Sequence, residues 1–330
     1  MIDLLVNGLA VTRSSLGVRR YYDSVMRHLD WPGQVQVSRP TRWRALDRTA
    51  DLLHPGRSDA VLWTPCQRGP LLARHHVVTV HDCINVEFVY RDDWRLPLFR
   101  RMFNQVLNNA EAVVAISNAT RDALLRQYRI DIAKITVIRS GCDVLVGATA
   151  MAPVLDTVEA GRPFVLMVTN ALPHKNNLAA CRAYANSRAA GDKVALRVVG
   201  QLPDAAREAC LQASVLLQLH PHVDDATLGA WYRQCRFLLS PSLAEGHNLP
   251  VAEALQLGAN VLCSDIPVHR EFYDGQVAFF KPGRAGSLEA AIDSALLRPG
   301  RWFDAAASAG RRSFRDVAAE YRRLFLALSA

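Results

Sequence analysis

Short apolar runs alternate with helical patterns along almost the whole chain. In the first half, strands are predicted at 2–6, 60–63, 77–80, 112–116 and 135–138, and helices at 18–29, 98–109 and 118–128. In the second half, strands are predicted at 164–168, 195–199, 215–219, 236–239, 260–263 and 277–280, and helices at 177–189, 225–235, 250–257, 288–297 and 314–328. Strands that alternate with helices pair in parallel and are covered on both faces, so the pattern predicts an α/β protein with doubly wound sheets.

The length of 330 residues suits two domains of about 150 residues each. Between the two series of strands, residues 144–163 are rich in small residues, contain two prolines and show no clear period, which is typical of a linker. We therefore predict a first Rossmann-like domain over 1–150, a second over 151–312, and a last helix in 313–330. In such sheets ligands bind outside the carboxyl ends of the strands, so we expect the site in a cleft that both domains face.

Composition narrows the class of protein. The net charge is +8, with most of the excess in residues 1–150, which favours anionic partners such as phosphates or an anionic membrane. The seven cysteines are scattered without a C-x-x-C pair, so we expect free thiols, a reducing cytoplasm and no zinc site. The sequence shows neither a signal-peptide pattern nor an apolar stretch of about 20 residues that could span a membrane.

The stretch LAEGHNLPVAEAL, residues 243–255, places two glutamates around a turn. Pro250 fits the first turn of a helix, where its missing N–H costs nothing. We expect Glu253 in that first turn, facing outward, and Glu245 in the loop before it. The N–H groups that follow from Gly246 would form a concave anion site between the two carboxylates. An ordinary loop–helix junction with acids near its start is the structural alternative.

One of only four lysines stands in a second suggestive place. The strand at 164–168 is followed by Thr169 and Asn170, and the next loop carries His174 and Lys175 into a helix. A cation at a helix N-terminus opposes the helix dipole, so a bound anion would offset the repulsion, and phosphate is the natural candidate. A lysine in an exposed loop is the alternative.

Two features of the first half also follow predicted strands. After the first strand, Asn7 and Gly8 lead into a loop that contains Arg13, and Gly17 then opens a helix, an arrangement that can receive a phosphate or a sugar. His81 and Asp82 come just beyond the strand at 77–80, where they would point into the cleft. Turn glycines and a structural histidine are the simpler explanations.

Taken together, these motifs resemble the retaining GT-B glycosyltransferases of family 4, which include bacterial polysaccharide and lipopolysaccharide mannosyl- and rhamnosyltransferases. The resemblance rests on SPSLAEGHNLPVAEALQLGANVLCSD preceded by HVDDATLGAWY, and also covers the N-terminal glycine loop, VHD, VVAISNATRD, IRSGCD and PHKNN. The family has Glu-Gly-Phe-Gly-Leu-Pro with a second Glu eight residues after the first. The resemblance implies the GT-B fold, in which the last helix crosses back to the first domain.

The resemblance assigns roles by position. Glu245 would hold the donor sugar, Lys175 would neutralise the donor pyrophosphate, and His81 would meet the sugar from the other wall of the cleft. Glu253 would accept hydrogen bonds from the ribose hydroxyls. The remaining donor-binding candidates are Gly246, His247, Asn248, Leu249, Asn170 and His174, and the candidates for the acceptor and phosphate side are Gly17, Arg13 and Asp82.

Three positions depart from the family pattern. His247 and Asn248 stand where Phe and Gly are usual; Asn tolerates positive φ better than most residues, so the turn is expected to survive, and His247 is expected to influence the choice of donor. His174 stands where Arg often accompanies the lysine, which leaves one permanent charge at the phosphate site. The N-terminal loop has the single Gly17.

The function implied is the retaining, metal-independent transfer of a mannose- or rhamnose-like hexose to a glycan or lipid-linked glycan. The donor would be a nucleotide-diphosphate sugar, with GDP favoured over UDP or dTDP, and no cofactor is expected. Residues 88–103 interleave aromatics with arginines and could rest on the inner face of the cell membrane. An ordinary amphipathic segment that covers the core is the alternative. The alternatives are a catalytically silent partner subunit and a sugar-nucleotide epimerase; a nucleic-acid-binding protein is disfavoured because no binding module is present.

Overall fold

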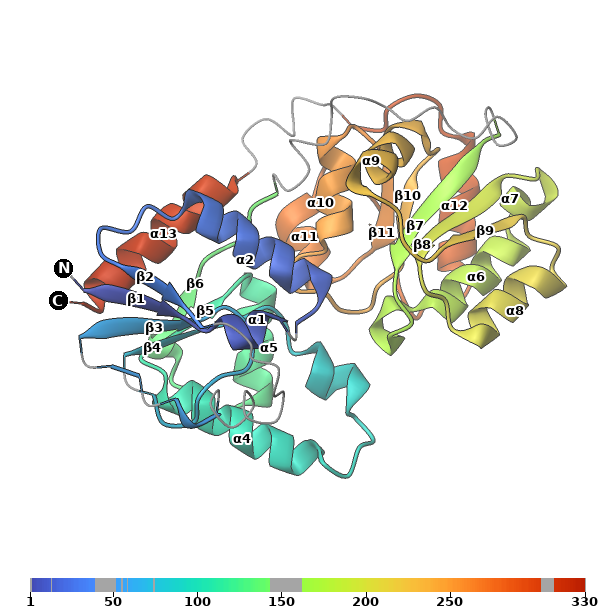
Figure 1. Ribbon diagram of the computed structural model, residues 1–330. Helices are drawn as coiled ribbons and strands as arrows, with labels where there is room; N and C mark the ends of the chain where they lie inside the picture. The colour runs from blue at the N-terminus through green and yellow to red at the C-terminus, as the bar shows by residue number, and fades with distance from the viewer. Residues whose placement is uncertain are drawn as a thin grey trace. The chain divides into compact units, whose positions relative to one another are not determined.

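A computed structural model describes residues 2–12, 14–38, 52–54, 56–57, 59–73, 75–142, 162–303 and 312–329. The chain divides into two compact units. The first consists of Met1–Gly141 with Arg312–Ala330, and the second of Cys142–Arg311. All but the last two residues of the expected linker, 144–163, lie outside the described residues. Figure 1 shows each unit as a central sheet flanked by helices.

The first unit contains a six-stranded sheet in which every pair of neighbouring strands is parallel, in the order β2-β1-β3-β4-β5-β6. The strands are β1 (Asp3–Val6), β2 (Val35–Val37), β3 (Ala60–Thr64), β4 (His76–Val80), β5 (Ala112–Ala115) and β6 (Ile135–Val137). Strands β3, β4 and β5 are buried along their whole length, as expected for parallel strands covered on both faces.

Helices cover both faces of this sheet. They are α1 (Gly8–Thr12), α2 (Leu16–His28), α4 (Leu96–Asn109), α5 (Asn118–Gln127) and α13 (Phe314–Ala327), with a π-helical turn η1 (Asn85–Val89) and a 3-10 turn η2 (Ile132–Lys134). Side chains of α4 and α5 pack against β4 and β5, with Phe103, Leu107 and Leu124 among the buried contacts. Ser117 caps α5 by accepting a hydrogen bond from the Thr120 N–H at 3.0 Å, as its sequence predicts.

The C-terminal helix α13 belongs to the first unit and packs beside α2 (Figure 1). The Tyr321 hydroxyl lies 3.1 Å from the Tyr21 hydroxyl of α2 and 2.7 Å from Thr79 Oγ1 of β4, and all three residues are buried. A Cβ atom at Gly141 would stand 2.7 Å from the Phe314 backbone nitrogen, so only glycine lets the end of the first stretch pass the start of α13.

The second unit repeats the design with a parallel sheet in the order β12-β11-β10-β7-β8-β9. The strands are β7 (Phe164–Thr169), β8 (Ala195–Gly200), β9 (Leu217–His220), β10 (Leu238–Ser240), β11 (Val261–Ser264) and β12 (Ala278–Phe280). Both units therefore have the doubly wound α/β architecture that the alternation of strands and helices predicts.

Each face of the second sheet carries its own core. One core contains buried residues of α6 (Asn177–Asn186), α8 (Asp204–Gln212) and α12 (Ser287–Leu297), with α7 (Arg188–Gly191) beside them. The other contains residues of α9 (Asp225–Gln234), α10 (Leu249–Gln256) and α11 (Pro267–Tyr273). The 3-10 turn η3 (Pro173–Lys175) joins β7 to α6. The seven cysteines are free thiols, as expected.

Every strand and helix that the sequence predicts is found, with ends that shift by up to about two residues, except that the helix expected at 177–189 is split into α6 and α7. Among the described residues, the α-helices and strands that were not predicted are α1, β2, α8 and α11, and the short turns η1, η2 and η3 were not predicted either. Their signals are weak because α1 and α11 are short, β2 is exposed at all three residues, and the buried residues of α8 are the small Ala206 and Cys210.

Candidate functional site

The second sheet has a topological switch point at the carboxyl ends of β7 and β10. These two strands are neighbours, yet the chain runs from β7 outward through β8 and β9 before it returns on the other side to β10. The loops that leave the two strands therefore diverge in opposite directions, and open α/β sheets bind ligands at such points, outside the carboxyl ends of the strands. The loop after β7 carries Lys175, and the loop after β10 carries Glu245.

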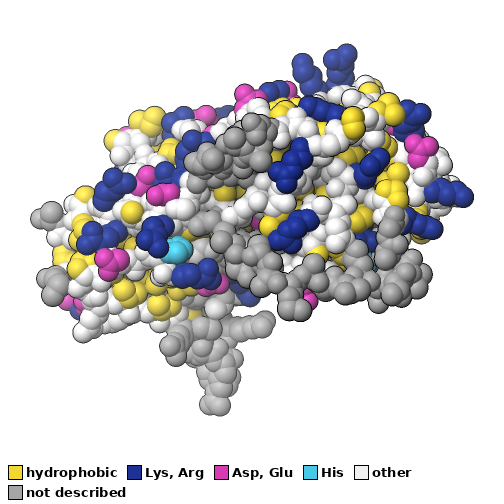
Figure 2. Space-filling view, turned by 90° about the horizontal axis from the view of Figure 1, so that it is seen from above, with side chains coloured by type: hydrophobic (Ala, Val, Ile, Leu, Met, Phe, Trp, Pro, Cys, Tyr) yellow, Lys and Arg dark blue, Asp and Glu magenta, His cyan; other side chains and the backbone are white. Residues whose placement is uncertain are grey.

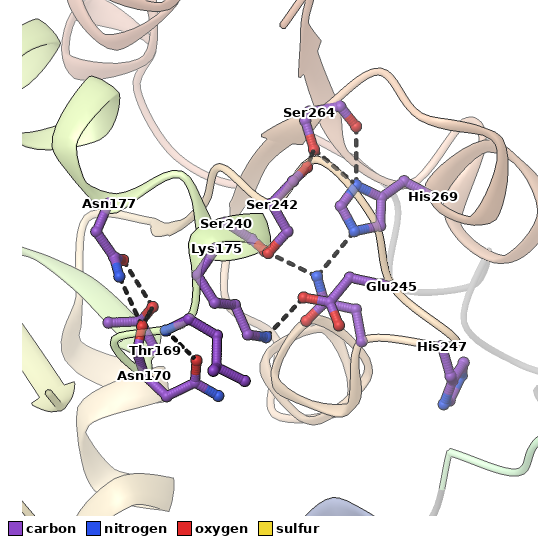
Figure 3. Close-up of polar contacts among 12 residues, drawn as sticks. Thr169, Asn170, Lys175, Asn177, Ser240, Ser242, Glu245, His247, Ser264 and His269 are labelled. Carbon is purple, nitrogen blue, oxygen red and sulfur yellow. Dashed lines mark hydrogen bonds and ion pairs between the residues drawn. The ribbon is translucent and has the colours of Figure 1, made fainter. Parts of the chain in front are cut away.

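Lys175 and Glu245 form an ion pair across this point. The Lys175 Nζ atom lies 2.6 Å from Glu245 Oε1, and the two side chains are 14% and 10% exposed (Figure 3). Burial acts to raise the pKa of Glu245, but the charge of Lys175 and hydrogen bonds from Lys175 and Ser242 outweigh it, so the pKa stays below its ordinary value. Glu245 is therefore a carboxylate at neutral pH.

His174, next to this lysine, supplies no second charge. Its side chain is buried, and burial lowers its pKa to about 4, although Glu245 acts in the opposite direction. Its carbonyl accepts a hydrogen bond from the Leu243 N–H at 2.7 Å, which ties the loop after β7 to the loop after β10. His174 thus ties the two loops together through its backbone carbonyl, and its buried ring is neutral at neutral pH.

The turn between Glu245 and α10 has the geometry that the sequence predicts. Asn248 adopts the left-handed conformation with φ +73°, and Pro250 lies in the first turn of α10. Among the described residues, the N–H groups of Gly246 and Leu249 find no hydrogen-bond acceptor. These groups lie at the start of a helix, where the helix dipole also favours an anion.

The expectation that Glu253 faces outward from the first turn of this helix is wrong. Helix α10 begins at Leu249, so Glu253 is its fifth residue, and only 2% of its surface is exposed. The hydroxyl of Tyr232 on α9 donates a hydrogen bond to Glu253 Oε2 at 3.1 Å. The side chain turns inward because α9 packs against α10 and offers a buried donor.

Asn170 lies at the end of β7, and its side chain and backbone serve the neighbouring turn. Its Oδ1 atom accepts from the Leu172 N–H at 3.0 Å, and its carbonyl accepts from the Asn177 amide at 2.6 Å. Thr169 donates from its hydroxyl to the side-chain oxygen of Asn177 at 2.7 Å (Figure 3). These bonds fix the turn that leads to Lys175, and Asn170 itself is exposed.

His247 is buried against α11. Its ring lies edge-on to Phe272 with the centroids 4.4 Å apart, and its Nε2 atom lies 3.6 Å from the Cys142 sulfur. Figure 3 shows its side chain apart from the pair formed by Lys175 and Glu245. The structure therefore gives the His247 ring a packing role, and its backbone is the part that belongs to the turn.

In the first unit, His81 follows β4 and is buried. Its Nε2–H donates to the Pro65 carbonyl at 2.9 Å, its ring lies edge-on to Tyr21, and burial lowers its pKa to about 4. Asp82 is half-buried and accepts from the Ile84 N–H at 3.0 Å. These contacts are those of a structural histidine, which is the simpler explanation given above for His81.

The loop expected after Gly8 is in fact the helix α1. Gly8 is required there because a Cβ atom would stand 2.3 Å from the Ser38 carbonyl oxygen. Gly17 is the second residue of α2, as expected, and Ser15 caps that helix. Arg13 lies outside the described residues.

The sequence did not point to four polar residues that surround the turn in the second unit: Ser240, Ser264, His269 and Tyr232. Asn248 donates to Ser240 and His269. Ser264 donates to the Ser242 carbonyl, and Figure 3 shows Ser264 beside Ser242 and His269. Ser240 and Ser264 could have been found from the sequence, because they are small hydroxylated residues at the ends of β10 and β11. Polar residues at the carboxyl ends of neighbouring parallel strands lie close together.

The surface segment 88–103 carries exposed apolar side chains. Trp94 is 85% exposed and Leu98 is 60% exposed, and Arg91, Arg95, Arg100 and Arg101 are exposed around them. Figure 2 shows Lys and Arg side chains scattered over the viewed face with acidic side chains between them. Within the described ranges, no helix combines the length and hydropathy that crossing a bilayer requires.

The two halves of the chain match two family models. Residues 157–312 match the model described as glycosyl transferases group 1, and residues 11–144 match Glycosyltransferase Family 4. Over 231 residues the chain is 27% identical to the O-antigen chain mannosyltransferase RfbU of Salmonella typhimurium. That match covers 68% of this chain and 61% of the relative, so the chain spans about three fifths of the length of this curated protein.

Solved structures share the fold over nearly the whole chain. HepE of Anabaena, in complex with UDP and glucose, has a TM-score of 0.73 at 14% identity and is matched over 99% of this chain and 100% of its own. WaaG, a glycosyltransferase involved in lipopolysaccharide biosynthesis, has a TM-score of 0.63 at 13% identity, over 98% of this chain and 95% of its own. Each half of the chain matches a glycosyltransferase model, and the two doubly wound units have the GT-B fold.

Proposed function

We propose that this protein is a glycosyltransferase that moves a hexose from a nucleotide-diphosphate sugar to a glycan or lipid-linked glycan acceptor, with retention, in the synthesis of a cell-surface polysaccharide. The observation that carries the proposal is the ion pair of Lys175 and Glu245, 2.6 Å apart at the switch point of the second sheet. A nearly buried cation and a helix start with N–H groups that lack an acceptor among the described residues form a pair of anion-binding elements.

The second unit is the donor-binding part in this proposal. Lys175 and the N–H groups of Gly246 and Leu249 neutralise the diphosphate, and Glu245 accepts hydrogen bonds from sugar hydroxyls. Glu253 accepts from the ribose, which requires its buried carboxylate to share its Tyr232 contact or to change rotamer. Asn170, His174, His247 and Asn248 serve the donor by holding the two loops in shape, through the contacts described above.

In the chemical step, the bond between the anomeric carbon and the diphosphate oxygen breaks, and a bond from that carbon to the acceptor oxygen forms on the same face of the sugar. The proton of the acceptor hydroxyl passes to the departing phosphate oxygen. Negative charge grows on the diphosphate as it leaves, and a fixed cation and fixed N–H dipoles stabilise that charge most in the transition state. Lys175 performs the task that a divalent cation performs elsewhere, so the reaction is metal-independent and needs no cofactor.

The donor sugar in this proposal is mannose- or rhamnose-like, and GDP is the favoured nucleotide over UDP and dTDP. The relative named an O-antigen chain mannosyltransferase supports the sugar and the polysaccharide product. HepE was solved with UDP and glucose, which makes a UDP-sugar the first competitor to test.

The first unit is the acceptor-binding part. Gly17 and Asp82 are its candidates because they lie on the segments that follow β1 and β4, and the sequence adds Arg13. His81, which follows β4 directly, meets the donor sugar in this proposal. The exposed Trp94 and Leu98, with arginines around them, provide a contact for an anionic membrane that carries a lipid-linked acceptor. The enzyme would then work in the cytoplasm, peripheral to the inner face of the membrane.

A silent partner subunit or an epimerase would use the same fold differently. A silent subunit has no reason to keep a nearly buried lysine–carboxylate pair at the ligand edge of the sheet. The test is release of nucleoside diphosphate from GDP-, UDP- and dTDP-sugars, with and without acceptor. Release from one of them supports transfer, epimerised sugar without release supports the epimerase, and no reaction with any donor supports the silent subunit.

A further inference from the structure

A buried network of polar side chains lies behind the turn that joins Glu245 to α10. We infer that Asn248 and His269 are positioning residues that hold this turn in its anion-binding shape, an inference that rests on the proposed donor site. Neither residue reaches the reacting atoms in this scheme. They act through the backbone of residues 245–249.

Asn248 uses both hydrogens of its side-chain amide. The Nδ2 atom donates to Ser240 Oγ at 2.8 Å and to His269 Nε2 at 2.8 Å, and Asn248 is buried. An amide NH₂ has two donors, so its donor capacity is filled. The side chain therefore fastens the left-handed turn residue to the end of β10 and to α11 at once.

His269 completes the link to the next strand. It is fully buried, and its Nδ1–H donates to the Ser264 carbonyl at 2.8 Å, since a carbonyl can only accept. Its Nε2 atom is then the acceptor for Asn248, which fixes one neutral tautomer. Burial lowers the pKa of His269, which agrees with a ring that stays neutral at physiological pH.

A second residue of α11 holds the same turn. The single O–H of Tyr273 is shared between the carbonyls of His247 and Asn248, at 2.9 and 3.1 Å. Ser264 donates to the Ser242 carbonyl, and Ser242 in turn hydrogen-bonds Glu245. Asn176 reaches from the turn after Lys175 to the Pro241 carbonyl at 3.3 Å. The network thus connects His269 to both members of the ion pair.

Glycine would satisfy the backbone at position 248, where φ is +73°, but it would leave the turn free to move. Asparagine is among the few other residues that adopt this conformation readily, and here its side chain adds the anchor. A turn that is already ordered binds its ligand without a further loss of conformational entropy. The anchor should therefore lower the donor KM and the dissociation constant of the nucleoside diphosphate.

The test compares N248G, H269F and the double variant in the purified full chain. Each single change should raise the donor KM and the nucleoside diphosphate dissociation constant about tenfold, the effect expected for one buried hydrogen bond of about 1.4 kcal/mol. The double variant should be impaired by less than the product of the two single effects, because each single change already breaks the hydrogen bond that the two residues share. Hydrogen exchange of amides 245–251 should quicken in all three proteins.

The control is I292V, which shortens a buried side chain of α12 in the core on the face of the sheet opposite α10 and α11. It should lower the melting temperature and leave KM and exchange of 245–251 unchanged. If N248G behaves like I292V, or if the two single effects multiply, the positioning role is overturned. If wild-type protein binds none of the nucleoside diphosphates, the proposed function fails. The exchange measurement needs no ligand, so unchanged hydrogen exchange of 245–251 in N248G would by itself show that the Asn248 side chain does not hold the turn.

Discussion

Lys175 and Glu245 are 70 residues apart in the chain, yet their charged atoms lie 2.6 Å apart where the loops after β7 and β10 diverge. The pair is nearly buried, so each charge depends on the other for its stability in a region of low dielectric. Removing either partner alone therefore changes the stability of the fold as well as the chemistry, and experiments on this site need both readouts.

Replacing Lys175 with Met should lower turnover about 10²- to 10³-fold, because a fixed charge that stabilises the leaving diphosphate is lost. The same change leaves Glu245 as an unpaired carboxylate, which should cost about 1–3 kcal/mol of unfolding free energy. Adding E245Q should restore most of the stability and none of the activity. Denaturant titration and steady-state kinetics on the three variants check both effects, and recovery of activity in the double variant would contradict the role of the lysine.

The two glutamates should separate in their effects on sugar and nucleotide. E245Q should lower kcat/KM for the nucleotide sugar by about 10-fold or more while it changes the affinity for the free nucleoside diphosphate by less than about threefold. E253Q should weaken the binding of the free nucleoside diphosphate. Calorimetry with the nucleoside diphosphate alone distinguishes the two. The larger loss in E245Q would reverse the assignment.

Tyr232→Phe is a matched control for Glu253, because it removes the hydroxyl that donates to the carboxylate without touching the acid itself. If that contact orients Glu253 for the ribose, Y232F should weaken the binding of the nucleoside diphosphate, as E253Q does, but by a smaller factor. A lower melting temperature with unchanged nucleotide affinity would show that the contact between Tyr232 and Glu253 only stabilises the packing of α9 against α10.

Folding stability should fall as the pH falls below about 6.5, the ordinary histidine pKa. Burial lowers the pKa of His76 to about 3 and that of His81 and His174 to about 4, and it also lowers that of His269. Between pH 6.5 and 4 the unfolded chain therefore binds more protons than the folded chain. Each such histidine contributes a slope of up to about 1.4 kcal/mol for each pH unit.

Denaturant titrations at pH 7, 6 and 5 measure this slope. H76Q removes one buried histidine from the first unit, which does not contain the candidate donor site. It should lower the slope of the unfolding free energy against pH by about the contribution of one histidine. A free energy of unfolding that is the same at pH 5 and pH 7 would show that these rings are protonated in the folded protein.

The segment 88–103 should bind anionic vesicles through its exposed side chains. Flotation with phosphatidylglycerol-containing liposomes should recover wild-type protein at low salt, with recovery falling as salt screens the arginines. The double variant W94S/L98S should lose most of this binding. L211S is the matched control, since Leu211 is 63% exposed on the second unit and lies on α8. Equal flotation of the two variants would show that the segment 88–103 does not bind the vesicles.

The strand–helix alternation was enough to predict both parallel sheets, because period and length separate buried strands from amphipathic helices in most segments. It missed α1 and α11, which are too short to show a period, and the break between α6 and α7. In the site, the loop positions of Lys175 and Glu245 were readable from the strands that precede them. Their 2.6 Å contact was not, because it depends on which strands are neighbours.

The orientation of Glu253 shows the limit of reasoning from a helix start. Proline at the first turn correctly indicated where α10 begins, within one residue, but the direction of an acid on that helix is decided by its neighbour α9. Likewise, Asn248 was recognised as a residue that tolerates positive φ, whereas its partner His269 lies 21 positions further along the chain. Contacts between distant segments carry no local signal.

Metal independence can be tested without any mutation. Because Lys175 is proposed to neutralise the diphosphate, turnover measured in excess EDTA should stay within about twofold of turnover in Mg²⁺ or Mn²⁺. A loss of about 10²-fold in EDTA that Mg²⁺ reverses would show that a bound cation, rather than the lysine alone, stabilises the leaving group.

The most direct test of the central claim is the release of nucleoside diphosphate from GDP-mannose, with UDP- and dTDP-sugars in parallel, by wild-type protein and by K175M. The proposal predicts release from one of these donors, faster with acceptor, and a loss of at least about 10²-fold in K175M. Equal rates in the two proteins, or no release from any donor by folded wild-type protein, would contradict a donor site built on Lys175 and Glu245.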